Sequence, residues 1–209
     1  MPYICLLLSG AALLANGMAT LGHVPRRDTA ALNLLVGGTQ LLLGVVYVAA
    51  AGNAPAPLLT AAGMFLFGAT YLYSGLDVLL ALGSRGLGWF CGLVAFCGAL
   101  LAAAWLGADP LLAVLWVCWS VLWGLLFACL ALGAVRLERF TGWALVLAAP
   151  ASATVPALLG LAGFWPDSPT AAWTAALLGA TLFAAARALA RRGPKVPRRA
   201  NTGDPAPAK

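Results

Sequence analysis

The sequence predicts an all-α fold, a polytopic membrane helix bundle with seven spans. Hydrophobic residues make up 63% of the chain and its mean hydropathy is +0.95. Charged residues make up only 9%, whereas a soluble domain carries about a quarter. The chain consists largely of apolar stretches of about twenty residues, which is the length a helix needs to cross a bilayer. A water-soluble fold is excluded, and the short alternating strands of a membrane β-barrel are not seen.

Glycine, proline and charged residues divide the chain into its candidate spans. The first stretch lacks the positive region of a signal peptide, so we expect it to be retained as a span. The basic, proline-rich segment 191–209 has no apolar face and is expected to be a disordered cytoplasmic tail. Residues 1–190 form the predicted transmembrane domain, with spans near 3–22, 29–52, 57–83, 86–107, 110–133, 140–164 and 169–190.

Basic residues fall on one side of this predicted topology. All 12 Lys and Arg residues lie in alternate loops or close to the carboxyl terminus, whereas the opposite loops carry only Asp109 and Asp167. By the positive-inside rule, the amino terminus is outside and the carboxyl terminus is cytoplasmic, in a bacterial inner membrane. The basic residues are Arg26, Arg27, Arg85, Arg136, Arg139, Arg187, Arg191, Arg192, Lys195, Arg198, Arg199 and Lys209.

The remaining polar residues argue against several classes of function. The formal charge of +6 reflects topology rather than a nucleic-acid site, because no folded basic domain carries it. The single histidine, His23, has no cysteine or carboxylate at ligand spacing, and the five cysteines form no Cys-x-x-Cys pair, so no metal site or cofactor is expected. The only carboxylate within a span is Asp77, close enough to its cytoplasmic end to reach the interface or an arginine. An enzyme and an ion-coupled transporter are both disfavoured.

Aromatic residues provide the strongest candidate site. Trp116, Trp119 and Trp123 lie at mid-depth with spacing i, i+3, i+7, which places them within about 60° on one helix face. Phe67 and Tyr71 share a face of the third span at similar depth. Core packing explains any one ring, but a buried indole N–H needs a partner, which a passage for a small polar solute supplies. The pattern favours a slot for a flat, uncharged solute.

Uncharged polar residues recur at a spacing of seven. Ser9 and Asn16 share a face of the first span with Leu6 and Leu13, and the second span repeats the pattern with Asn33 and Gln40. Such groups either fasten helices together by about 1 kcal/mol each or line a pore. The sequence leaves both interpretations open.

Four segments resemble the AmiS/UreI family of urea and short-chain amide channels. They are NGMATLGHVPRRDTAALNLLVGG from Asn16, LFGATYLY from Leu66, WVCWSVLW from Trp116 and FTGWAL from Phe140. The similarity covers about residues 6–161. It implies a passive channel through a six-helix core in each protomer, assembled as a homo-hexamer, and this chain adds a seventh transmembrane helix to that core. The implied lining positions are Phe67, Tyr71, Trp119, Leu122 and Trp123, with Leu6, Ser9, Leu13 and Asn16 from the first span.

The chain departs from the acid-gated members of that family in three ways. Its outer loops are short and lack histidine, so gating near pH 6 has no titrating group. A glutamate that such channels carry in the sixth span aligns with Ala148. The seventh span reverses the side of the carboxyl terminus.

These features lead to one main hypothesis and two alternatives. The main hypothesis is a passive channel for small uncharged amides, not gated by acid, that supplies a cytoplasmic amidase or urease. One alternative is an alternating-access carrier for small solutes such as sugars, whose flux would saturate. The other is a membrane assembly partner that transports nothing and has a dry core.

Overall fold

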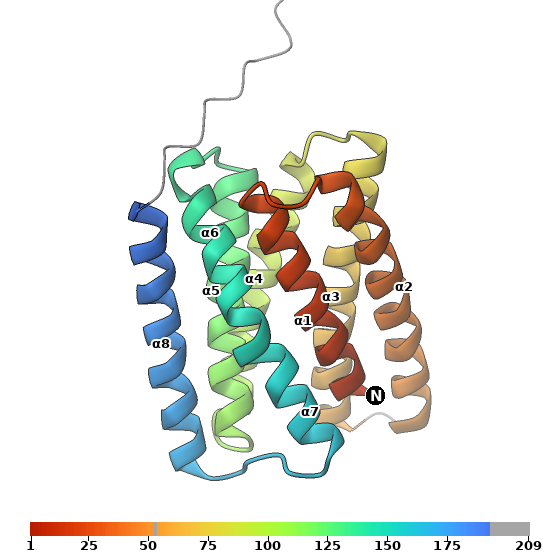
Figure 1. Cartoon of the computed structure of the whole chain (residues 1–209). Coiled ribbons are helices and arrows are strands. Elements are labelled where there is room, and N and C mark those ends of the chain that lie inside the picture. The colour runs from red at the N-terminus through yellow and green to blue at the C-terminus, as the bar shows by residue number, and fades with distance from the viewer. Residues whose placement is uncertain (52–53, 193–209) are drawn as a thin grey trace, which may run out of the picture.

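Seven long helical segments run back and forth across the molecule. The structure is a computed structural model and describes residues 1–51 and 54–192. Within this part of the chain, seven segments are long and apolar enough to cross a membrane, and Figure 1 shows them side by side in one bundle. They are α1 (Pro2–Thr20), α2 (Arg26–Ala51), α3 (Pro55–Leu80), α4 (Arg85–Trp105), α5 (Pro110–Leu130), the joined elements α6 (Val135–Ala148), η1 (Ala149–Thr154) and α7 (Val155–Leu161), and α8 (Pro169–Arg192).

The predicted all-α membrane bundle is confirmed, with small shifts at the helix ends. The largest shift is in the sixth span, which begins at Val135 rather than near residue 140. The last helix continues through Arg192, two residues beyond the predicted end at 190. The remainder of the predicted tail, residues 193–209, lies outside the described residues.

The sixth span contains a π-helical turn that the sequence analysis did not predict. In η1 the Val155 N–H donates to the carbonyl of Pro150, a bond that reaches back five residues instead of four. Pro150 and Pro156 lack the N–H groups that a regular α-helix needs at these positions. The wider turn changes the direction of the following side chains. One result is that Ser152 is buried inside the bundle.

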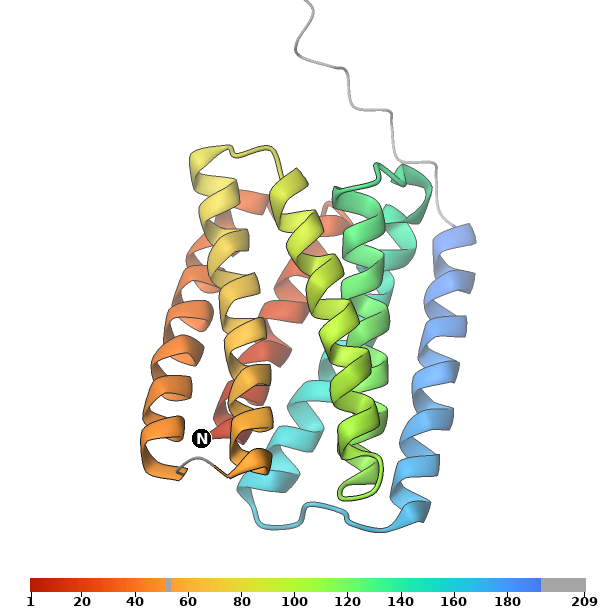
Figure 2. The same ribbon diagram turned by 180° about the vertical axis from the view of Figure 1, so that it is seen from behind.

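Helix α1 occupies the middle of the bundle, and α8 lies at its edge. α1 packs against α2 and α3 on one side and against α6, η1 and α7 on the other. α8 packs only on α5 and α6 among the pairs with substantial contact, and Figures 1 and 2 show it at the far side from α2. The space enclosed by α1, α3 and α5 is therefore the interior on which the candidate residues converge.

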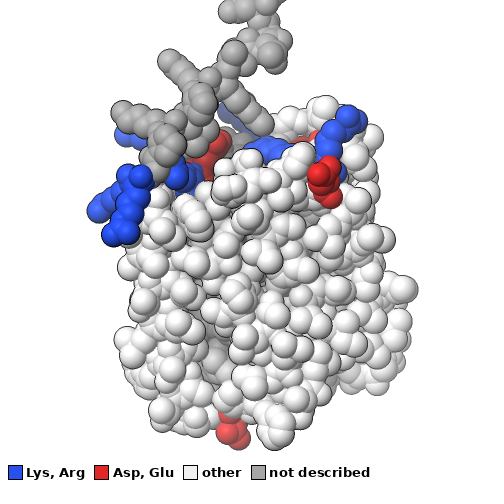
Figure 3. Space-filling view, in the orientation of Figure 1, with Lys and Arg blue, Asp and Glu red and all other residues white. Residues whose placement is uncertain are grey.

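Charge is distributed unequally between the two ends of the bundle. In Figure 3 the Lys and Arg atoms gather, together with some Asp and Glu atoms, at the end where α1 joins α2, whereas the only charged atoms seen at the opposite end are acidic. We call these the basic end and the acidic end. The amino terminus lies at the acidic end, and the described chain finishes at the basic end, as seven crossings require (Figure 1).

Helices α2 and α3 approach each other closely at Gly37. A Cβ atom at this position would lie 2.7 Å from the carbonyl oxygen of Gly68 and 2.8 Å from the Cα atom of Leu72. Both neighbours are backbone atoms, which cannot rotate away. The next residue, Gly38, has nothing within 4 Å of an added Cβ atom.

This pair of glycines gives a matched test of the packing. Gly37→Ala should force α2 and α3 apart and lower the free energy of unfolding by about 1–3 kcal/mol. Gly38→Ala brings the same gain in helix propensity as Gly37→Ala but no steric conflict, so it should leave the free energy of unfolding unchanged or raise it slightly. Thermal unfolding of the two variants in detergent checks the difference, and equal melting temperatures would contradict the close approach.

Candidate functional site

An aromatic cluster forms where α3 faces α5. The Phe67 ring stacks on Trp123 with 4.5 Å between ring centroids and 12° between ring planes. It meets Trp119 edge to face at 5.3 Å, and Trp116 lies 5.2 Å from Phe67 and 5.1 Å from Trp119. Each of these rings is at most 7% exposed. The two aromatic faces identified in the sequence therefore contact each other in the interior.

Protein hydroxyl groups bind two of the indole N–H groups in this cluster. Trp119 Nε1–H donates to Ser152 Oγ at 3.2 Å, and Trp123 Nε1–H donates to Thr70 Oγ1 at 3.1 Å. Each hydroxyl donates its own proton to a carbonyl in its own helix, at 2.8 Å. The expectation that a passing solute supplies these partners was wrong. The bonds instead fix the orientation of both rings.

Polar side chains on α1 and α2 pair at two depths. The amides of Asn16 and Asn33 exchange two hydrogen bonds of 2.9 and 2.7 Å, which supports the fastener interpretation for this pair. About two helical turns closer to the acidic end, Gln40 Nε2 donates to Ser9 Oγ and to the backbone carbonyl of Cys5, each at 2.8 Å. The spacing of seven residues on both helices brings these partners to matching heights.

Two cavities enter the bundle from opposite ends and are separated by the aromatic cluster. The acidic-end vestibule, of about 380 Å³, reaches inward to Phe67 and Trp119. The basic-end vestibule, of about 90 Å³, reaches inward to Tyr71 and Trp123. Because Phe67 stacks directly on Trp123, this pair of rings forms part of the wall that divides the two cavities.

Nine of the ten candidate residues line one of the vestibules. Leu122 is the exception, since it is fully buried and contributes to neither wall. The structure places Leu6, Ser9, Phe67, Trp116 and Trp119 around the acidic-end vestibule and Leu13, Asn16, Tyr71 and Trp123 around the basic-end vestibule.

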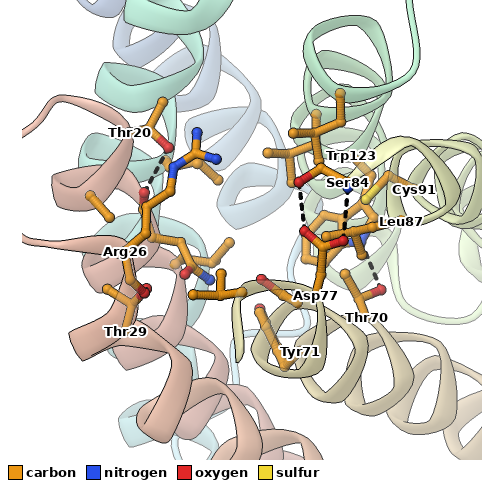
Figure 4. A pocket seen from close by; sticks show the side chains of 18 residues that line it. Thr20, Arg26, Thr29, Thr70, Tyr71, Asp77, Ser84, Leu87, Cys91 and Trp123 are labelled. Carbon is orange, nitrogen blue, oxygen red and sulfur yellow. Dashed lines mark hydrogen bonds between the residues drawn. The ribbon is translucent and has the colours of Figure 1, made fainter. Parts of the chain in front are cut away.

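The basic-end vestibule has a polar mouth. Figure 4 shows Arg26 and Thr29 of α2 on the opposite side of this cavity from Asp77 and Tyr71 of α3. Asp77 is only 6% exposed. It accepts hydrogen bonds from the backbone N–H and the hydroxyl of Ser84, so its partner is the α3–α4 turn rather than an arginine.

The acidic-end vestibule opens beside a carboxylate that is already engaged. Asp109 Oδ1 accepts from the Leu112 N–H at 2.9 Å and so caps the start of α5. Its Oδ2 accepts from Trp165 Nε1–H at 2.9 Å, which ties the loop after α7 to this helix end. The entrance is thus held by α5 and by the α7–α8 loop together.

Comparison with known proteins accounts for this arrangement. The family model described as AmiS/UreI family transporter matches residues 1–164. This match contains all ten candidate residues. The chain belongs to the AmiS/UreI family.

Relatives of the AmiS/UreI family are similar over most of this chain. A protein of Rhodococcus erythropolis assigned as transporter AmiS2 is 40% identical over 202 residues, covering 94% of this chain and 97% of that protein. A protein of Mycolicibacterium smegmatis assigned as a transporter of amidate substrates is 35% identical, covering 88% of this chain and 87% of that protein. The crystal structure of the urea channel from Helicobacter pylori has a TM-score of 0.71 at 30% identity, covering 79% of this chain and 100% of that chain.

The family model and the AmiS2 relative match this AmiS/UreI protein over different lengths. The family match ends at residue 164, before α8 begins. The similarity to AmiS2 covers 94% of the chain and must therefore extend into α8. This helix lies outside the family's shared core.

The bond between Trp123 and Thr70 can be tested with two similar threonines on α3. Thr70→Val removes the acceptor of a buried indole N–H and should lower the free energy of unfolding by about 1–3 kcal/mol. Thr60 also donates to the carbonyl four residues back, at 3.0 Å, but binds no indole. Thr60→Val should therefore lower the free energy of unfolding by much less than Thr70→Val. Thermal unfolding in detergent measures both, and an equal loss for the two variants would contradict the assigned role of Thr70.

Proposed function

We propose that this chain is a passive channel for urea and short-chain aliphatic amides such as acetamide and formamide. The path runs through the interior of each protomer, between α1, α3 and α5. The observation that carries the proposal is the pair of vestibules that enter from opposite ends and approach each other at one stack of aromatic rings. The proposed lining residues are the nine that line a vestibule, namely Leu6, Ser9, Leu13, Asn16, Phe67, Tyr71, Trp116, Trp119 and Trp123, whereas Leu122 packs behind them.

The chemistry of the narrow part suits a flat, neutral solute. Phe67, Trp119 and Trp123 are parallel or perpendicular surfaces that can hold a planar molecule, whose N–H groups can point at ring faces. Hydrated ions would have to shed water here without a ring of carbonyl or charged groups to replace it. Neutral amides lose much less on dehydration, so the slot selects them over ions.

The relatives support the same class of solute. One carries the name of a transporter of amidate substrates and another that of an acid-activated urea channel. An amide and urea share a planar core with a carbonyl and an N–H₂ group. A single aromatic slot therefore serves both, and we propose that the channel supplies a cytoplasmic amidase or urease.

We also propose its placement and assembly. The clustering of basic residues at one end supports a bacterial inner membrane location with the amino terminus outside and the carboxyl terminus in the cytoplasm. The acidic-end vestibule then opens outward. The family relationship supports a homo-hexamer in which every protomer conducts on its own.

Flux measurements in proteoliposomes test the proposed path. Wild-type protein should speed the entry of urea and acetamide, recorded by stopped-flow light scattering, with flux that rises linearly with concentration. Phe67→Ala removes one ring of the stack and should raise the flux of butyramide relative to urea by about tenfold, equivalent to about 1.4 kcal/mol of barrier.

Trp89→Ala is the matched control for that variant. Trp89 is 61% exposed, packs on Phe127 and lines neither vestibule. Its removal should leave the butyramide-to-urea ratio unchanged. Flux no faster than in protein-free vesicles for every amide would overturn the channel, and saturating flux with counterflow would indicate a carrier.

Acidification should have little effect on this channel. The only histidine is His23, which is exposed at the basic end, and the acidic-end loops hold no histidine. Urea flux at pH 5.5 and at pH 7.5 should therefore agree within about twofold, because the acidic-end loops lack the imidazole group that titrates in this range. A steep rise on acidification of the outer face would show that gating uses another group.

A further inference from the structure

One buried amide oxygen in the wall of the acidic-end vestibule has no hydrogen-bond partner. Gln40 of α2 is fully buried at 0% exposure and lines this vestibule. Its Nε2 atom is used twice, on Ser9 Oγ and on the carbonyl oxygen of Cys5. Its Oε1 atom accepts no hydrogen bond from the described residues. An unpaired acceptor in a membrane interior is costly, which invites a ligand that donates a hydrogen bond.

The orientation of the Gln40 amide follows from its neighbours. A backbone carbonyl oxygen can only accept, so the group within 2.8 Å of the Cys5 oxygen must be the N–H₂. Rotating the amide by 180° would place two oxygen atoms against each other. The oxygen is therefore the atom left without a partner.

A second unpaired polar group lies close by. The Tyr71 hydroxyl is on the basic-end side of the aromatic stack, and the residue is 2% exposed. It has no hydrogen bond within 3.5 Å among the described residues, although it interacts with Ser9, the same hydroxyl that Gln40 binds. Ser9 thus lies near both an unpaired acceptor on α2 and an unpaired hydroxyl on α3.

We propose that Gln40 and Tyr71 form a hydrogen-bonding subsite for the permeating amide. Gln40 Oε1 accepts from an N–H group of the solute on the acidic-end side of the aromatic stack, and the Tyr71 hydroxyl donates to the solute's carbonyl oxygen on the basic-end side. This proposal rests on the proposed function and adds its basis for selectivity. The aromatic rings select a flat shape, and the subsite selects a solute that carries N–H donors beside a carbonyl, as urea and primary amides do.

The contrast with Asn33 supports a special role for Gln40. Both are buried amides on one face of α2, spaced by seven residues, and both bind α1. The Asn33 side chain uses its oxygen and its nitrogen on Asn16. Its need for partners is met within the protein, whereas that of Gln40 is not. Of these two amides, Gln40 alone has an atom left to bind a solute.

The test compares solutes that differ in N–H donors. In vesicles containing Gln40→Leu, acetamide flux should fall by about tenfold, the effect of one lost hydrogen bond of ordinary strength. The flux of N,N-dimethylacetamide, which has no N–H, should stay within about twofold of wild type on the same reasoning. Thr39→Leu, one residue away on an exposed face of α2, lines neither vestibule and is the control, so it should leave the ratio of the two fluxes unchanged. Equal losses for both solutes, or no loss for either, would overturn the subsite.

A second variant covers the case in which Gln40→Leu fails to fold. Gln40→Glu at pH 5, in its neutral form, keeps a carbonyl oxygen as acceptor and an O–H group as donor to Cys5 or Ser9. It should conduct acetamide within about twofold of wild type, because the group that binds the solute is retained. Loss of acetamide flux in this variant, with dimethylacetamide unaffected by the change, would show that an acceptor alone is insufficient and would overturn the proposal. Absence of amide flux in wild-type vesicles would instead refute the proposed function itself.

Discussion

The interior of this bundle is governed by the need to give every polar group a partner without help from water. In a hydrocarbon layer an unpaired N–H or hydroxyl costs several kcal/mol, so partners must come from the protein. The bonds from Trp123 to Thr70 and from Trp119 to Ser152 meet this need. They also determine where the two indole planes lie. The shape of the aromatic slot thus depends on two hydroxyl groups outside the ring cluster.

Much of the fold could be predicted from the sequence because membrane helices obey few and strong rules. Length, apolar content and the sidedness of basic residues together determined seven spans. The facing aromatic residues were found because the helical period of 3.6 residues puts Trp116, Trp119 and Trp123 on one face. The same period predicted which faces of α1 and α2 carry Ser9, Asn16, Asn33 and Gln40.

The features that could not be predicted from the sequence depend on contacts between distant residues or on unusual backbone geometry. Ser152 is 33 residues from Trp119 in sequence and reaches it from the span that contains the π-helical turn. Asp77 binds Ser84 because the connecting turn takes positive φ angles, 52° at Ala81 and 62° at Ser84, where neither residue is glycine. The two prolines of the sixth span were the available signal for the first feature, and nothing in the local sequence indicated the second.

Gln40 shows why the spacing of polar residues alone could not decide whether each residue fastens two helices together or lines a pore. The spacing of seven residues predicts that Gln40 and Asn33 lie on one face, and it treats them as equivalent. Their partners differ, because Asn16 offers a donor and an acceptor whereas Cys5 and Ser9 meet Gln40 only at its nitrogen. The unpaired oxygen becomes visible only when both helices are in place.

The seventh span, α8, contributes no residue to the site. None of the residues lining either vestibule belongs to α8, which packs on the outer side of α5 and α6. The family match ends before this helix, yet already contains the aromatic stack and both of its hydroxyl partners. The proposed path is therefore lined without any residue of α8. The addition of α8 brings the described chain back to the basic end of the bundle without altering the residues on which the proposed slot depends.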